Sequence, residues 1–198
     1  QLRVDSSLLG VKVDLPAPFA KAANQGSYAD WRMTLSGAER RYWFEYADQL
    51  SLNLAAPAED ILAGRGQLRL GGGLASLPTQ KGLQVRGSLS TLDLAAWQAL
   101  IAQHKLAEQG QETQQLLSSA ELNIRHFTGL GVVLDNLSVA LRPQGQGWQL
   151  LLDSDLVKGE INEQGANQPT LVNLAYLRLP QTLTSEVSGA ADPLADVD

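Results

Sequence analysis

Apolar and polar residues alternate one by one along most of the chain. Clear examples are Leu50–Leu54, Leu137–Leu141 and Trp148–Leu152. This period of two is typical of strands that bury one face. Turn sequences such as Ser36-Gly37 and Pro143-Gln144-Gly145 separate the runs, at spacings of about 8–12 residues that suit hairpins and meanders. The pattern predicts a mainly β fold with a long antiparallel sheet.

The remaining alternating runs predict further strands on the same grounds. They cover Leu9–Leu15, Trp31–Leu35, Tyr42–Tyr46, Leu68–Leu70, Leu83–Leu89, Leu122–Ile124, Val132–Leu134 and Leu171–Leu179. Two more turns are expected, at Gly71–Gly73 and at Asp135-Asn136.

One segment has a helical period instead. Between Asp93 and Gln109 the apolar residues fall at 94, 97, 100 and 101, a spacing that places them on one side of an α-helix. Asp93 is a suitable N-cap, and Leu92 before it can pack on Trp97. We therefore predict one α-helix near 93–109, and a short helical turn at 18–23 that begins with proline.

The composition raises the question of what covers the apolar face of the sheet. The chain holds 36 leucines against 15 valines and isoleucines together, although leucine is not a favoured strand residue. A helix about 10 Å wide covers only some two strands spaced about 4.8 Å apart. The rest of the apolar face must fold onto itself as a sandwich, meet another module, or hold an apolar ligand.

The charges and cysteines narrow the class of protein. The formal net charge is −6, which argues against a nucleic-acid partner because such proteins need a basic face. Residues 181–198 carry four acidic residues, no basic residue and no periodicity, so we predict a folded segment over 1–180 followed by an acidic linker or disordered tail. No cysteine is present, which excludes disulfides and thiolate chemistry.

The sequence shows no catalytic constellation. His104 and His126 have no partners at metal-ligand spacing, and no Gly-x-Ser-x-Gly motif occurs. Gly71–Gly73 lack the Lys-Ser/Thr of a phosphate-binding loop, and Glu59-Asp60 falls in an expected loop, where a capping role suits it. We expect no enzyme activity, no metal and no cofactor.

The densest aromatic run is Arg40–Tyr46. Its side chains suit three roles: a sugar-stacking platform together with Trp31, an anchor for lipid headgroups through the arginines, or an ordinary core strand. The first role would make the chain a carbohydrate-binding module.

Three stretches in the second half of the chain follow one another in a fixed order, in which Gly-Trp opens an alternating strand: Phe127–Arg142, Gly147–Leu156 and Gly159–Ile161. In this order they resemble the AsmA-like repeat, of which the YhdP family is a branch. The phrases that look like the YhdP branch are Val13–Lys21, Gly64–Gly71, Leu77-Pro78, Gly82–Gly87 and Leu92–Trp97. The resemblance covers most of residues 1–180.

The resemblance implies a function. YhdP-like proteins are similar to TamB and other bridge-like proteins of Gram-negative bacteria, which are anchored in the inner membrane and extend through the periplasm. Their curled sheets form a groove, or taco-like shape, whose apolar interior is thought to carry phospholipid toward the outer membrane. The chain would then be an internal, periplasmic segment that meets neighbouring segments of the same protein and phospholipid acyl chains, with no catalytic residue to transfer.

In this family strand alternation, not a motif, defines the lipid-facing positions. We therefore predict a lipid-facing groove from the apolar positions of the alternating runs. The candidates are Val11, Val13, Met33, Leu35, Leu52, Leu54, Leu122, Ile124, Val132, Leu134, Val139, Leu141, Leu150 and Leu152. A structural or partner-binding sandwich remains the alternative, because a second sheet would close the same leucine-rich face.

Overall fold

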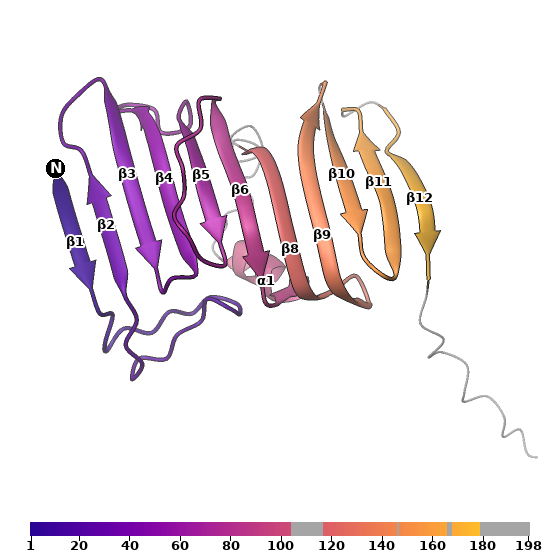
Figure 1. Cartoon of the computed structure of the whole chain (residues 1–198), viewed down its shortest axis with the longest axis horizontal. Coiled ribbons are helices and arrows are strands. Elements are labelled where there is room, and N and C mark those ends of the chain that lie inside the picture. Colours follow the sequence, from indigo (N-terminus) through magenta and orange to yellow (C-terminus); the bar gives the residue numbers. More distant parts are fainter. Residues whose placement is uncertain (104–116, 146, 166–167, 179–198) are drawn as a thin grey trace, which may run out of the picture.

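Twelve strands form one open, curled sheet in the computed structural model (Figure 1). The model describes residues 1–103, 117–145, 147–165 and 168–178. Within these residues there is one helix and no second sheet, so the sandwich alternative is not formed. The predicted acidic tail at 181–198 lies outside the described residues.

In the described part of the chain, twelve strands and one helix follow one another in sequence. Their bounds are β1 Leu2–Ser6, β2 Ala29–Met33, β3 Glu39–Tyr46, β4 Leu50–Pro57, β5 Arg65–Leu70, β6 Gly82–Leu89, β7 Leu92–Asp93, α1 Leu94–Gln103, β8 Leu117–Gly129, β9 Val132–Gln144, β10 Gly147–Asp153, β11 Val157–Glu163 and β12 Leu171–Leu177. In space the strands keep this order, except that β7 lies off the main path and pairs only with β8.

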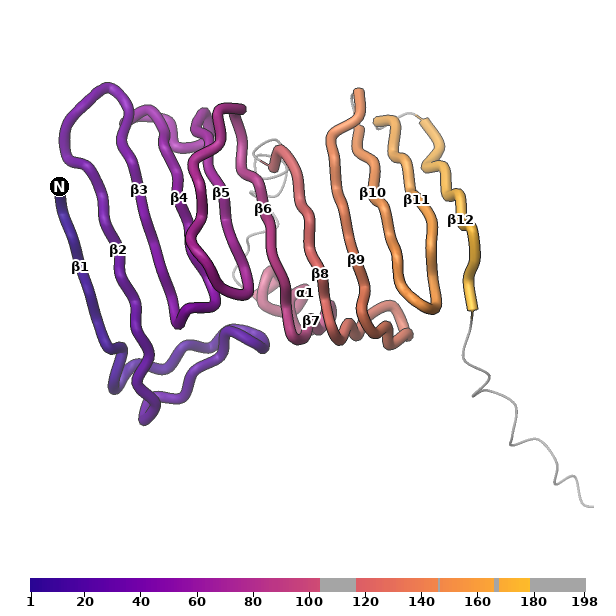
Figure 2. The backbone as a smooth tube through the Cα atoms, in the orientation of Figure 1, coloured from indigo at the N-terminus to yellow at the C-terminus, as the bar shows by residue number. Residues whose placement is uncertain are grey.

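The sheet is mixed, which corrects the prediction of a purely antiparallel one. β5, β6 and β8 run parallel, and so do β7 and β8, whereas the other neighbours are antiparallel. Parallel neighbours need a link that returns along the strand. Residues 71–81 supply the first return, over the β4–β5 region (Figure 2); the second, between β6 and β8, contains β7 and α1.

The strand predicted at Leu9–Leu15 is wrong. Residues 7–28 form an irregular link between β1 and β2, in which one bridge joins Val13 and Lys21. Leu8 and Gly10 have φ values of 48° and 86°, in the left-handed region that extended strands do not use. The helical turn predicted at 18–23 is also absent, because Lys21 is part of that bridge.

One predicted turn is also wrong. Asp135 and Asn136 lie inside β9, which continues from Val132 to Gln144. Asn136 does take a left-handed conformation, with φ 52°, but the chain reverses earlier, at Leu130 and Gly131 between β8 and β9. The turn at Ser36-Gly37 is confirmed in the link after β2. The turn expected at Pro143-Gln144-Gly145 begins later than predicted, because Pro143 and Gln144 still pair with β10 and only Gly145 lies in the link.

The predicted helix is confirmed over its described part, Leu94–Gln103. The carboxylate Oδ1 of Asp93 accepts a hydrogen bond from the backbone N–H of Ala96 at 3.1 Å, which is the expected N-cap. The predicted continuation to Gln109 lies outside the described residues.

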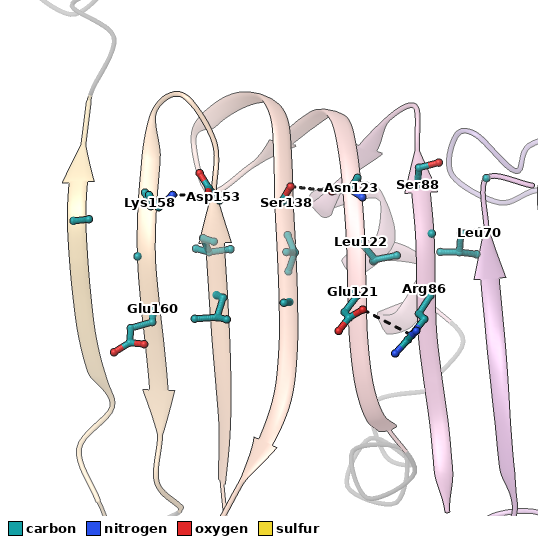
Figure 3. A pocket seen from close by; sticks show the side chains of 18 of the residues that line it. Leu70, Arg86, Ser88, Glu121, Leu122, Asn123, Ser138, Asp153, Lys158 and Glu160 are labelled. Atoms are coloured by element: carbon teal, nitrogen blue, oxygen red, sulfur yellow. Dashed lines mark hydrogen bonds and ion pairs between the residues drawn. The ribbon is translucent and has the colours of Figure 1, made fainter. Parts of the chain in front are cut away.

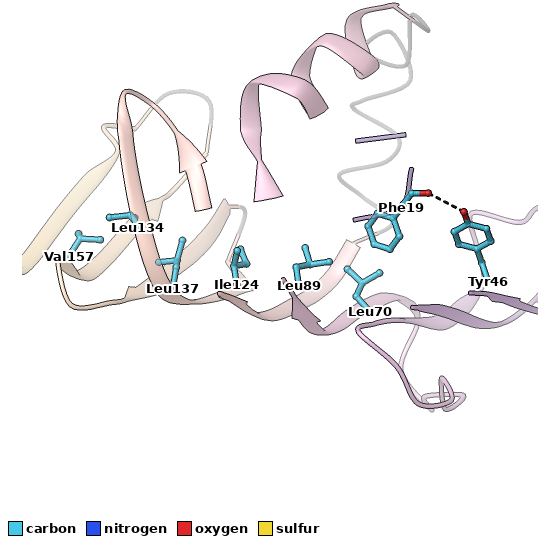
Figure 4. Packing of buried hydrophobic residues seen from close by; sticks show 8 residues of the cluster. All are labelled: Phe19, Tyr46, Leu70, Leu89, Ile124, Leu134, Leu137 and Val157. Carbon is cyan, nitrogen blue, oxygen red and sulfur yellow. Dashed lines mark hydrogen bonds between the residues drawn. The ribbon is translucent and has the colours of Figure 1, made fainter. Parts of the chain in front are cut away.

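The buried core lies on the side of the sheet that carries α1 (Figure 4). The sheet supplies most of it, and Phe19 from the β1–β2 link and the half-buried Trp97 from α1 pack onto it. The core residues are Phe19, Tyr46, Leu70, Leu89, Ile124, Leu134, Leu137 and Val157. Most of the sheet's contributors lie toward one rim, the lower one in Figure 1, where the β1–β2 link and α1 also lie.

Candidate functional site

The two faces of the sheet differ sharply in polarity. Residues opposite one another on neighbouring strands point to the same face, so the pairing register traces rows of side chains across the sheet. One such row crosses all eleven strands of the main path and contains only apolar residues, and we call it the apolar row. It consists of Val4, Trp31, Phe44, Leu52, Leu68, Val85, Ala120, Leu141, Leu150, Ile161 and Val172.

A shift of one residue along each strand gives the opposite face. The resulting row is polar at every strand except β9 and β10, and we call it the polar row. It consists of Asp5, Asp30, Glu45, Ser51, Arg69, Arg86, Glu121, Ala140, Leu151, Glu160 and Asn173. The apolar face therefore continues without interruption through the parallel strands in the middle of the sheet.

Nine of the predicted lipid-facing residues share the apolar face. They are Met33, Leu52, Leu54, Leu122, Ile124, Val139, Leu141, Leu150 and Leu152. Leu52, Leu141 and Leu150 belong to the apolar row itself. Leu122, Val139 and Leu152 are paired with one another on β8, β9 and β10, one step closer to the buried rim.

Of the other five predicted residues, two belong to the buried core and three lie in links. Val132 and Leu134 are at the start of β9, where Leu134 is buried in the core and Val132 packs against it. Val11 and Val13 lie in the irregular β1–β2 link, and Leu35 lies in the link after β2 with 57% of its surface exposed. Alternation continues through these links, but the backbone turns there and forms no strand beyond the single bridge of Val13.

Sequence reasoning missed eight members of the apolar row as candidates. These are Val4, Trp31, Phe44, Leu68, Val85, Ala120, Ile161 and Val172. Most stand in alternating runs, so their inward direction was visible. The signal that unites them is the register between strands, which depends on contacts far apart in the sequence.

The polar face is fixed by ion pairs, most densely around Asp30. This buried carboxylate accepts hydrogen bonds from Arg32, from Arg3 at 2.7 Å and from Tyr28 at 3.1 Å. Burial raises the pKa of Asp30, but the hydrogen bonds from Arg32, Arg3 and Tyr28 together hold that pKa below its ordinary value. The cluster ties the edge strand β1 to β2.

A cavity of about 870 Å³ lies over the polar row between β5 and β12 (Figure 3). Four of its charged side chains form two ion pairs: Lys158 with Asp153 at 2.7 Å, and Arg86 with Glu121 at 3.8 Å. The hydrogen bond to Asp153 raises the pKa of Lys158 above its ordinary value. Ser138 donates to Asn123 at 2.8 Å. The lining holds serines but no histidine that could activate them.

The aromatic run Arg40–Tyr46 belongs to β3, and its rings are divided between the two faces of the sheet. Trp31 pairs with Phe44 on the apolar face, whereas Trp43 pairs with Arg32 on the polar face. Trp43 lies under the guanidinium of Arg41, 5.0 Å from the ring centroid. The two tryptophans expected in a sugar-stacking platform, Trp31 and Trp43, therefore lie on opposite faces.

Other candidate chemistry is accounted for locally. His126 lies 2.7 Å from the carboxylate of Asp135 at the surface, and His104 lies outside the described residues. Within the described ranges, no group of His, Asp and Glu side chains is arranged to hold a metal ion. Asp60 accepts backbone N–H bonds from Leu62 and Ala63, the capping role expected for a carboxylate in this loop.

Comparison with known proteins gives one match. The family described as YhdP protein matches residues 1–196. No curated protein and no solved structure matches the chain significantly. In the part of the chain that the structure describes, no helix has the length and apolar character needed to cross a membrane.

Proposed function

Because the chain belongs to the YhdP family, we propose that its apolar face is one wall of a conduit for phospholipid acyl chains. The observation that carries the proposal is the apolar row, which stays apolar on all eleven strands of the main path from β1 to β12. Ten strand spacings of about 4.8 Å give this row a length of roughly 48 Å. Such a length accommodates several acyl chains along the sheet.

The physical basis is the transfer of hydrocarbon out of water. Each methylene group of an acyl chain that leaves water contributes about 0.8 kcal/mol. Leucine is the commonest residue in the row, at Leu52, Leu68, Leu141 and Leu150, and its flexible side chain adapts to a mobile ligand. Since the positions are nearly equivalent, a chain can slide along them without breaking a specific polar contact.

In this proposal the lipid headgroups stay in water at the rim of the sheet opposite the buried core. Arg40 is paired with Ala56 and lies on the same face as Tyr42 and Leu54, at the end of β3 away from the buried core. A guanidinium at the border of an apolar surface can form paired hydrogen bonds with a phosphate. Arg40 is therefore placed to contact a headgroup whose acyl chains lie along the apolar row.

The open edges of the sheet fit a longer assembly. Among the strands that the structure describes, β1 and β12 each pair on one side only. Both carry exposed apolar residues: Leu2 and Val4 on β1, and Val172 and Leu174 on β12. Unpaired edges bind further strands readily. We propose that neighbouring segments of the same protein continue the sheet, in a protein that lies in the periplasm, is anchored in the inner membrane and supports the outer-membrane barrier.

Site-specific photocrosslinking in cells that produce the protein tests the proposal. A photoreactive amino acid is placed at Leu68 or Leu150 on the apolar row, and the matched controls are Arg69 and Gln149, the next or preceding residues, which point to the polar face. We expect phospholipid adducts at the first two positions and none at the controls. If Leu68 and Leu150 give no adduct, or the controls give equal amounts, the proposal fails.

A further inference from the structure

Two segments far apart in the sequence meet over the apolar face. Phe19 comes from the link between β1 and β2, and Trp97 comes from α1 in the link between β6 and β8. Their ring centroids are 6.1 Å apart with an angle of 75° between the planes, the edge-to-face arrangement that aromatic pairs favour. Phe19 belongs to the core cluster (Figure 4), and the half-buried Trp97 packs against that cluster.

Phe19 is held firmly in this place. It is 5% exposed, and its carbonyl oxygen accepts a hydrogen bond from the hydroxyl of Tyr46 at 3.0 Å. Two residues later, Lys21 exchanges backbone hydrogen bonds with Val13 at 2.9 and 3.0 Å. The buried ammonium group of Lys21 donates to the carbonyls of Ala22 and Gln25 at 2.9 and 2.6 Å. The link therefore acts as a fixed strap.

Near this strap, the burial of side chains on the apolar face changes abruptly from one residue to the next along a strand. Leu70 at the end of β5 is buried, whereas Leu68, the preceding residue on the same face, is half-buried. In β8, Ile124 is 3% exposed, whereas Leu122 is again half-buried. On both β5 and β8, the change from buried to half-buried side chains thus falls between the buried rim and the apolar row.

A second cavity, of about 640 Å³, has Phe19 in its wall. Its lining is mixed: Phe19, Leu89 and Ile124 lie beside the charged Asp48 and Arg125. Phe19, Leu89 and Ile124 therefore belong both to the buried core cluster and to the wall of this cavity.

We propose that Phe19 and Trp97 form a partition that excludes acyl chains from the buried rim. The partition confines the acyl chains to the apolar row and to the part of the apolar face between that row and the opposite rim. The inference rests on the proposed function, and it assigns the two rings a positioning role for the lipid. Without the partition, an acyl chain would reach Leu89 and the cavity beside it, whose wall also carries Asp48 and Arg125.

The test uses the purified 198-residue chain and a phosphatidylglycerol that carries a diazirine in one acyl chain. After illumination, mass spectrometry maps the modified residues without any prior change to the protein. In the parent chain we expect adducts at Leu68 and other residues of the apolar row, and severalfold fewer at Leu89 and Ile124. In Phe19→Ala and in Trp97→Ala, adducts at Leu89 should rise severalfold while those at Leu68 persist.

The controls separate positioning from unfolding. Phe19→Leu keeps an apolar side chain of similar bulk, so it should keep the parent pattern. Trp43→Ala removes a ring of the same size as Trp97 from the polar face and should leave the pattern unchanged. Circular dichroism establishes that each variant is folded, and if Phe19→Ala does not fold, Trp97→Ala carries the test.

The outcomes distinguish the two proposals. Equal labelling of Leu89 and Leu68 in the parent chain, or no gain at Leu89 in a folded partition variant, overturns the partition and leaves the conduit standing. An absence of adducts anywhere on the apolar face overturns the conduit, and the partition falls with it.

Discussion

The division of the apolar face into a covered rim and an open row predicts different costs for the same truncation. Ile124→Ala and Leu68→Ala each remove three carbon atoms from the same face. Ile124 is 3% exposed and lies between Leu89 and Leu137 on the neighbouring strands. Leu68 is only half-buried between Leu52 and Val85.

The expected magnitudes follow from burial. Three carbons at about 0.8 kcal/mol each give about 2.4 kcal/mol, and the cavity left in a packed cluster brings the cost of Ile124→Ala to about 3–4 kcal/mol. At Leu68, where part of the side chain already contacts solvent, we expect about 1–2 kcal/mol. For a chain of this length, 3 kcal/mol corresponds to a decrease in Tm of roughly 6–12 °C.

Urea unfolding followed by circular dichroism measures both costs on the lipid-free chain. The midpoints should fall in the order parent, Leu68→Ala, Ile124→Ala, with similar slopes. The reasoning is refuted if Leu68→Ala costs as much as Ile124→Ala, because the apolar row would then be part of the permanent core. A cost below about 0.5 kcal/mol for Ile124→Ala would equally contradict the assignment of the rim as the stabilising core.

Three further changes test the sheet, its edge and the helix. Gly87→Ala should prevent β5 and β6 from pairing, because φ is 135° and a Cβ would lie 1.9 Å from the carbonyl oxygen of Leu70. The control is Gly131→Ala, at a position in open space with φ 77°. In a parallel unfolding measurement it should lower the free energy of unfolding by only about 1–2 kcal/mol. Asp30→Asn should lower the free energy of unfolding at pH 7. The difference from the parent should shrink as the pH falls below about 3.9, because the low pKa of Asp30 stabilises the fold only while the carboxylate is ionised. A difference in free energy of unfolding that stays constant down to pH 2.5 contradicts this. Asp93→Ala should cost about 0.5–2 kcal/mol through the lost N-cap, while Asp93→Ser restores most of it.

Much of the local structure could be read from the sequence. Alternation identified β3, β4 and β10, together with the face to which their inward residues belong. Asp93 and the apolar residues after it identified α1 and its cap. These predictions succeed because they depend on backbone geometry and on hydrogen bonds between residues close together in the chain.

The failures share a cause. Val11, Val13 and Leu35 alternate like their neighbours in sequence but lie in links, because a strand also needs a partner and the backbone there turns away. The parallel pairing of β5, β6 and β8 escaped prediction, because the links after β5 and β6 return along the strands before pairing begins.

The sequence by itself determined that this protein is a leucine-rich, mainly β chain with one apolar face per strand and with phrases of the YhdP family. Only the tertiary structure decided that these faces align into one row across eleven strands, and that Phe19 and Trp97 cover one side of it. The physical reason is how far apart in the sequence the interacting residues lie. Which way a side chain points from a strand depends on its neighbours in the chain, whereas register and covering depend on hydrogen bonds and packing between residues tens of positions apart.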